Sequence, residues 1–181
     1  MSWWIQTYTG RQFCLLSPMA EQVCIEDIAH HLSLTNRFCG ATPVAYSVSQ
    51  HSCHVCDLLP NEFKLLGLMH DSPEAYVGDW TRPLKLAMRS LEMMGPDLVY
   101  SGIADVVGRC FGLDLLNMPR EVKHADEVML ATERRDLMNH APNEWENLPD
   151  AANFRVVPWS ADRAEREFLE RFDRLIGRGD G

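Results

Sequence analysis

The sequence predicts an all-α fold of about six helices, with a short β-hairpin at the N-terminus. Apolar residues recur at intervals of three, four and seven in most segments, which is the period of an amphipathic helix. Gly or Pro stands at the expected ends of these segments. A length of 181 residues fits one domain. We expect its motif-bearing core to span about 25–140 and a C-terminal helix about 160–177.

The first third of the chain accounts for the hairpin and three helices. Weak alternation in "WIQTYTGRQFCLL" around its Thr-Gly pair predicts the hairpin. A helix after Pro18 ends near "NRFCG", where Gly40 can adopt the left-handed conformation of a cap. "SVSQHSCHVCDLL" forms the second helix, closed by Pro60, and "NEFKLLGLMHD" continues in a third. The apolar stripes of the first two are Ile25, Ile28 and Leu32, and Val48, His51, Val55 and Leu58.

Short and long helices are expected in the middle of the chain. Ser72 can cap, and Pro73 can open, a short turn "PEAYV" that Gly78 ends. A long helix follows at about 91–111, with Gly112 at its end. Its apolar side comprises Ile103, Val106, Val107 and Cys110.

The last third contains two helices separated by a loop. One helix starts at Pro119 and extends to about Asn139. Residues 140–159 are rich in Pro and Asn, which favours a loop. Ser160 then caps a final amphipathic helix that Gly177 ends.

Composition excludes several classes of function. A net charge of -9 disfavours binding to a nucleic-acid polymer, which needs clustered cations. No apolar run approaches the ~20 residues that span a bilayer, and the N-terminus lacks the features of a signal peptide. We therefore expect a cytoplasmic protein without membrane contact.

The six cysteines are expected to be mostly small buried hydrophobes, as in a reducing compartment. "CHVC" at 53–56 has the spacing of half a zinc site or of a redox pair, but no second CxxC accompanies it. A redox or structural zinc protein is therefore a less favoured alternative. It predicts loss of metal when Cys53 and Cys56 are changed to Ser.

Four polar residues occupy positions that should be buried. His51 shares an apolar stripe, His70 and Asp71 end an apolar run, and Asp126 lies on the inward stripe of the helix at 119–139. The same stripe takes in Glu133. Each residue taken alone is more often a satisfied core histidine or a boundary aspartate. Together they are explained by one shared metal ion, because burying unpaired charge is costly and two imidazoles with two carboxylates suit a divalent cation.

The order of these residues resembles the H…HD…D signature of the HD-domain metal-dependent phosphohydrolases. "NRF" at 36–38, "SVSQHS" at 47–52, "HDSPEAYVGDWTRPLK" at 70–85 and "VKHADEV" at 122–128 are similar to the bacterial 5'-deoxynucleotidase branch and its short phage relatives. The similarity spans residues 36–137. It implies a compact HD-domain helical bundle that binds a divalent metal ion (Co, Mn, Mg, Zn or Fe) and assembles as a homo-oligomer, a dimer or a larger ring.

The resemblance also assigns roles around the metal. It implies that the ligands are His51, His70, Asp71 and Asp126. Glu74 matches the catalytic carboxylate of the family, and Asp79 matches a second acidic residue implicated in proton transfer.

Substrate contacts are implied at four positions. Arg37 falls where the family holds the phosphate, and its planar guanidinium suits that role. Phe38 stands where the family has Trp and can stack on a base or sugar. Arg82 and Lys85 follow closely in "WTRPLK", where they either bind further phosphates or are solvated.

The expected function is hydrolysis of deoxynucleoside 5'-monophosphates to nucleoside and phosphate. One alternative is a dNTP triphosphohydrolase, which would release triphosphate. Another is a non-catalytic nucleotide sensor, against which the presence of Glu74 and Asp79 argues, because a binding protein has little use for proton-transfer groups.

Overall fold

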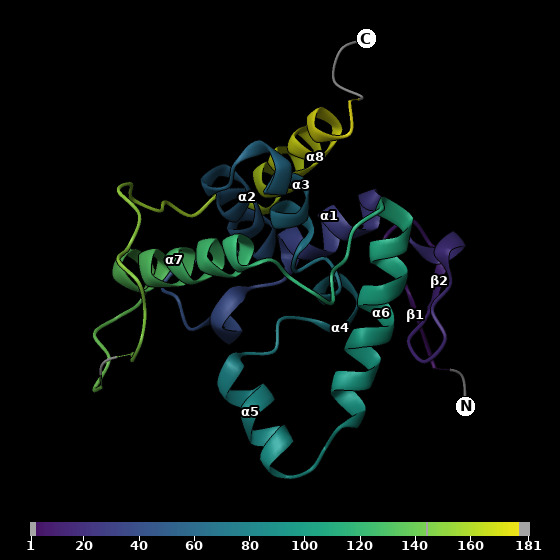
Figure 1. Ribbon diagram of the computed structural model, residues 1–181, viewed down its shortest axis with the longest axis horizontal. Helices are drawn as coiled ribbons and strands as arrows, with labels where there is room; N and C mark the ends of the chain where they lie inside the picture. Colours follow the sequence, from purple (N-terminus) through teal and green to yellow (C-terminus); the bar gives the residue numbers. More distant parts are fainter. Residues whose placement is uncertain (1–2, 144, 178–181) are drawn as a thin grey trace.

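Four helices form the centre of the fold and bring distant parts of the chain together. They are α1 (Ile25–Leu34), α2 (Val48–Leu58), α3 (Asn61–Met69) and α8 (Ala161–Leu175). The last helix, α8, packs on α1, α2 and α3 (Figure 1). The computed structural model describes residues 3–143 and 145–177. Its main hydrophobic core includes Ile28, Leu32, Val48, Leu68, Met69, Ile103 and Phe168.

The other helices surround this centre and carry the remaining site residues. Helix α7 (Arg120–Leu137) packs on α2 and α3, and a second core cluster joins them. The short α4 (Glu74–Val77) packs on α1 and α6 (Gly95–Phe111). Together with α6, α5 (Arg82–Ser90) forms an arm at the lower side of Figure 1. None of the α5 side chains is buried. Nowhere in the described part of the chain does a helix combine the length and apolar character needed to cross a membrane.

The predicted N-terminal hairpin is confirmed. Strands β1 (Trp4–Gln6) and β2 (Gln12–Cys14) pair antiparallel, with Ile5 opposite Phe13. The Phe13 ring is fully buried and stacks on Tyr76 of α4, with 3.7 Å between ring centroids. The hairpin therefore packs against the helix that begins at Glu74.

The end of α1 differs from the prediction. The helix stops at Leu34, and Gly40 does not cap it. Gly40 has φ +74 but belongs to a separate 3-10 helix, η2 (Arg37–Gly40). The backbone N–H of Arg37 donates to the carbonyl of Tyr46 at 2.9 Å, so long-range pairing turns the chain before it reaches Gly40.

Three other local predictions are wrong. Leu58 and Cys110, both expected on apolar stripes, are exposed. Ser72 does not cap α4 with its side chain, because its hydroxyl donates to the carbonyl of Met69 at 2.6 Å and so closes α3. The predicted end of α4 is correct, since Gly78 adopts φ +80.

The arm of α5 and α6 also departs from the prediction. The long helix begins at Gly95 instead of Leu91, because Glu92 at φ +57 and Pro96 in the first turn separate it from α5. It ends as expected at Gly112, which has φ +68.

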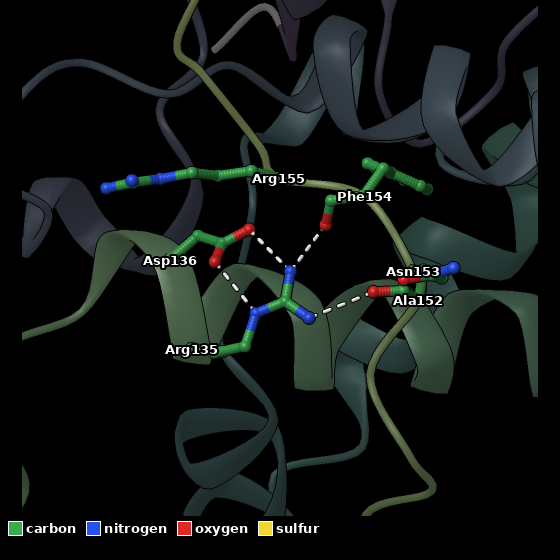
Figure 2. A pocket seen from close by; sticks show the side chains of 6 residues that line it. All are labelled: Arg135, Asp136, Ala152, Asn153, Phe154 and Arg155. Atoms are coloured by element: carbon green, nitrogen blue, oxygen red, sulfur yellow. Dashed lines mark hydrogen bonds and ion pairs between the residues drawn. The ribbon is translucent and has the colours of Figure 1, made fainter.

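The predicted loop between α7 and α8 is held by side chains that bind its backbone, among them those of Arg135, Thr132 and Gln50. Figure 2 shows Arg135 of α7, which makes a double ion pair with Asp136 and donates to the carbonyls of Ala152 and Phe154. A hollow of about 510 Å³ lies there, but each guanidinium nitrogen already donates to a protein acceptor. The loop then leads to Ser160, whose hydroxyl accepts the N–H of Arg163 and caps α8 as predicted.

Candidate metal centre

Three separate elements bring predicted ligands to one place. His51 comes from the middle of α2, His70 from the end of α3 and Asp126 from α7. Their ligand atoms all lie within 4.8 Å of one another. Asp71 adds a carboxylate oxygen that lies 3.1 Å from Nε2 of His70 and 3.7 Å from Nε2 of His51. The cluster can therefore hold a metal ion.

The hydrogen bonds of the two imidazoles decide which nitrogen faces the centre. Nδ1 of His51 lies 2.6 Å from a carboxylate oxygen of Glu133, and Nδ1 of His70 lies 2.7 Å from the carbonyl of Gly67. Both partners accept only, so each Nδ1 donates and a neutral ring carries its lone pair on Nε2. Both Nε2 atoms are buried and make no hydrogen bond of normal geometry, but each lies 3.1 Å from a carboxylate oxygen, of Asp126 for His51 and of Asp71 for His70. Nitrogens and carboxylates in this arrangement can share a proton or a metal ion, and the donor set suits a divalent metal.

Electrostatics at the centre favour a positive charge between the side chains. Burial and Arg37 lower the pKa of His51, but Glu133 and Asp126 outweigh them and raise it to about 9. Burial raises the pKa of Asp71, but His70, His51 and Arg37 reverse the shift and hold that pKa well below its usual range. The carboxylates thus stabilise a cation at the position of the Nε2 atoms, whether a proton or a metal ion provides the charge.

The centre is buried on one side and open on the other. The side chain of His51 is 0% exposed and that of Asp71 is 17% exposed, whereas that of Asp126 is 44% exposed. The Asp126 carboxylate on α7 is therefore in contact with solvent.

Glu133 connects three groups beneath the centre. This fully buried carboxylate accepts from Nδ1 of His51, from the hydroxyl of Tyr46 at 2.9 Å and from Nε of Arg37 at 3.1 Å. Burial raises the pKa of Glu133, but Arg37 and His51 outweigh it and lower that pKa. Glu133 thus remains charged and orients the imidazole. The inward stripe of α7 pointed to Glu133, whereas the sequence carried no signal for Tyr46.

Arg37 lies beside the centre, as the resemblance implied. It is 9% exposed, and its NH1 lies 3.6 Å from Asp71 while its Nε contacts Glu133. Burial by itself would lower the pKa of Arg37, but nearby carboxylates outweigh it and raise that pKa. The neighbouring Phe38 has φ +57 in a strained turn and packs against Trp145, with 6.2 Å between ring centroids.

The two candidate proton-transfer residues differ in burial. Glu74 is 3% exposed, one of its oxygens is buried without a partner, and the other lies 3.5 Å from Nζ of Lys85. Burial, Asp71 and Asp79 raise the pKa of Glu74 well above its usual value. Asp79 is half-buried, and burial raises its pKa too. Arg82, in contrast with Lys85, is exposed on α5.

The "CHVC" cysteines lie in the hydrophobic core. Cys53 and Cys56 are 0% and 2% exposed, and burial raises the pKa of both thiols, that of Cys56 to about 11. Thiols of high pKa are poor nucleophiles and poor metal ligands. Over residues 3–143 and 145–177, the set of clustered metal-ligating groups is His51, His70 and Asp126. The cysteines act as small apolar residues.

Comparison with known proteins gives relatives without a described activity. The uncharacterized protein YfdR of Escherichia coli K12 is 37% identical over 174 residues, which cover 94% of each chain. An uncharacterized protein of Rhodobacter capsulatus is 37% identical over 94 residues, which cover 47% of this chain and 48% of that protein. No protein-family model matches the sequence. Because the first match extends over nearly the whole of both chains, this protein belongs to the same family as YfdR.

Proposed function

We propose that this protein is a metal-dependent phosphohydrolase of the HD-domain type, which hydrolyses deoxynucleoside 5'-monophosphates to nucleoside and phosphate. One observation carries the proposal. Two buried imidazoles present their Nε2 atoms to the carboxylates of Asp71 and Asp126, in the order and setting of the H…HD…D pattern.

Each side chain around the centre has a defined task in this reaction. His51, His70, Asp71 and Asp126 would hold a divalent cation, which would supply Lewis-acid activation of a phosphoryl oxygen and of a water molecule. Arg37 stands beside Asp71 and offers a fixed positive charge to the phosphate oxygens. Asp79, the more exposed carboxylate, accepts a proton from the attacking water.

Glu74 serves as the proton donor to the leaving group. Its burial and its carboxylate neighbours raise its pKa, so the carboxyl keeps a proton at a higher pH than usual. As water adds to phosphorus and the bond from phosphorus to the 5' oxygen breaks, Glu74 protonates that oxygen. Lys85, 3.5 Å away, keeps the carboxyl in position.

The small number of cations at the centre favours one phosphate over three. Arg37 is already paired with Glu133 and Arg82 is exposed, so of these three cations Lys85, beside the protonated Glu74, is the one left for a phosphate. A monophosphate needs fewer such partners than a triphosphate.

The test is a substrate panel with the purified protein. Deoxynucleoside mono- and triphosphates are incubated with Mn, Co, Mg, Zn or Fe, and orthophosphate and triphosphate are measured separately. We expect orthophosphate from the monophosphates. Glu74→Ala should reduce kcat by ~100-fold or more, the usual contribution of a general acid. Glu62→Ala is the matched control, because Glu62 is an exposed residue of α3.

Other outcomes would contradict specific parts of the proposal. Release of triphosphate would establish the triphosphohydrolase alternative. Tight nucleotide binding without turnover under any metal would identify a sensor. A Glu74→Ala variant as fast as the parent would remove Glu74 from the mechanism.

A further inference from the structure

We propose that a second cavity, enclosed by α4, α5 and the start of α6, binds the nucleobase of the substrate through Trp80 and Tyr100. The cavity has a volume of about 560 Å³, within the range of small-molecule sites. This inference rests on the proposed function and adds where the nucleoside is held.

The cavity adjoins the candidate metal centre through one side chain. Lys85 lines the cavity, and its Nζ lies 3.5 Å from Glu74 and 5.5 Å from the centre of the Tyr100 ring. Gly78, at the end of the helix that begins with Glu74, is part of the same wall. The cavity is therefore separated by Lys85 from the carboxyl that we assign to the leaving 5' oxygen, and a nucleoside that extends from this oxygen can reach it.

Tyr100 belongs to both regions. Its ring lines the cavity. Burial and the negative charges of Asp71, Glu74, Asp79 and Asp126 raise the pKa of its hydroxyl. Lys85, whose Nζ lies 5.5 Å from the centre of the ring and 3.5 Å from Glu74, joins Tyr100 to the candidate proton donor.

The walls have the chemistry of a base-binding site. Trp80 and Tyr100 supply aromatic surface, on which any base can stack. Val77 and Val99 add apolar surface, and the paired Arg89 and Asp97, 2.8 Å apart, occupy another part of the wall. An apolar lining with a few polar groups is typical of a pocket for a heterocycle.

The alternative location for the base is Phe38, the residue that the sequence suggested. Phe38 packs against Trp145 and the guanidinium of Arg37, and it does not line this cavity. The two locations are on different elements and can be tested by separate substitutions.

The experiment compares binding of a phosphate-free ligand with discrimination during hydrolysis. Binding of 2'-deoxyadenosine is measured by calorimetry for the parent, Trp80→Ala, Trp80→Phe, Phe38→Ala and the control Trp3→Ala, whose indole is 60% exposed on the N-terminal segment. We expect Trp80→Ala to weaken binding by roughly 5- to 100-fold, the usual loss for one stacked base. Trp80→Phe should keep most of the affinity, and Trp3→Ala should match the parent.

The second measurement is the ratio of kcat/KM for dAMP to that for 2-deoxyribose 5-phosphate, which lacks a base. Trp80→Ala should reduce this ratio by a similar factor. A Trp80→Ala protein that melts like the parent and keeps both the affinity and the ratio overturns the inference. So does a loss confined to Phe38→Ala, which would place the base on Phe38.

Failure of this inference can be told from failure of the proposed function. Deoxyadenosine binding that depends on Trp80, in a protein that hydrolyses no phosphate ester, would leave the cavity assigned and refute the hydrolase. Hydrolysis of both phosphate esters without any effect of Trp80 would refute the cavity and leave the hydrolase.

Discussion

Glu133 shows how a residue beneath the candidate metal centre can fix the orientation of one of its imidazoles. Its carboxylate lies 2.6 Å from Nδ1 of His51, so the other ring nitrogen faces the candidate metal centre. Partners of this kind fix the tautomer and the orientation of a metal-binding imidazole. The cost of burying this charge is offset by Arg37 and by the hydroxyl of Tyr46.

Replacing Glu133 by Gln should therefore weaken metal binding. The change keeps the shape of the side chain but removes the charge that holds His51 and Arg37. We expect roughly 10- to 100-fold lower affinity for Mn or Co, the usual effect of losing such a partner. Competition with a chromophoric chelator measures the metal affinity of the parent and of the variant.

The control for this change is Glu127→Gln, because Glu127 is exposed on the same helix. It should bind metal like the parent. Equal affinities for the Glu133 and Glu127 variants would show that the carboxylate does not position His51.

At the scale of elements, α6 contains two glycines whose replacement by alanine should have opposite effects on the stability of the protein. A Cβ at Gly108 would lie 2.5 Å from the carbonyl oxygen of Leu113, a backbone atom that cannot move freely. A Cβ at Gly102 meets nothing within 4 Å. Glycine at position 102 therefore makes the helix less stable than alanine would, and no close contact requires it.

Substitution of each glycine by Ala tests this packing. Gly108→Ala should lower the free energy of unfolding by ~1–3 kcal/mol, as overpacking does. Gly102→Ala should raise it by about 0.5–1 kcal/mol. Urea unfolding measures the free energy of unfolding of both variants. A Gly108→Ala variant more stable than the parent would contradict the close packing at Gly108.

Helix ends were predictable where the determining contact is local. Gly78, Gly112 and Ser160 act within one turn, and all three end or cap their helices as expected. The sequence analysis did not predict α5, although Leu84, Met88 and Leu91 recur at helical spacing; none of the α5 side chains is buried, so no core contact marks the segment. Gly40 was misassigned because a distant backbone pairing redirects the chain.

At the scale of the whole molecule, the candidate centre links three parts of the fold. His51 lies on α2, His70 and Asp71 follow α3, and Asp126 lies on α7. A metal ion that binds only the folded chain adds stability that depends on its concentration. A metal ion bound at the centre would therefore cross-link these three parts of the fold.

Chelation should lower the melting temperature of the metal-loaded protein. With free metal at 100 times the dissociation constant, bound metal contributes ~2.7 kcal/mol. Its removal should lower Tm by roughly 5–10 °C for a chain of this size. Differential scanning calorimetry with and without EDTA measures the shift.

Two sets of variants show which residues bind the metal that raises the melting temperature. The His51→Ala and Asp126→Ala variants should show no shift on addition of EDTA, because they lack ligands. The Cys53→Ser and Cys56→Ser variants should keep the shift of the parent, since both thiols are buried in the core. A shift that depends on the cysteines would move the metal to "CHVC".

The sequence by itself determined the helical class, the hairpin and the set of side chains that meet at the candidate centre. Periodicity, glycine conformation and the order of His and Asp are local properties, so they can be recognised without coordinates. Only the tertiary structure decided that Arg37 pairs with Glu133, 96 positions away, and that each Nε2 faces the centre. It also decided that Trp80 and Tyr100 share a cavity. The physical reason is that pairing, orientation and burial depend on which distant segments pack together.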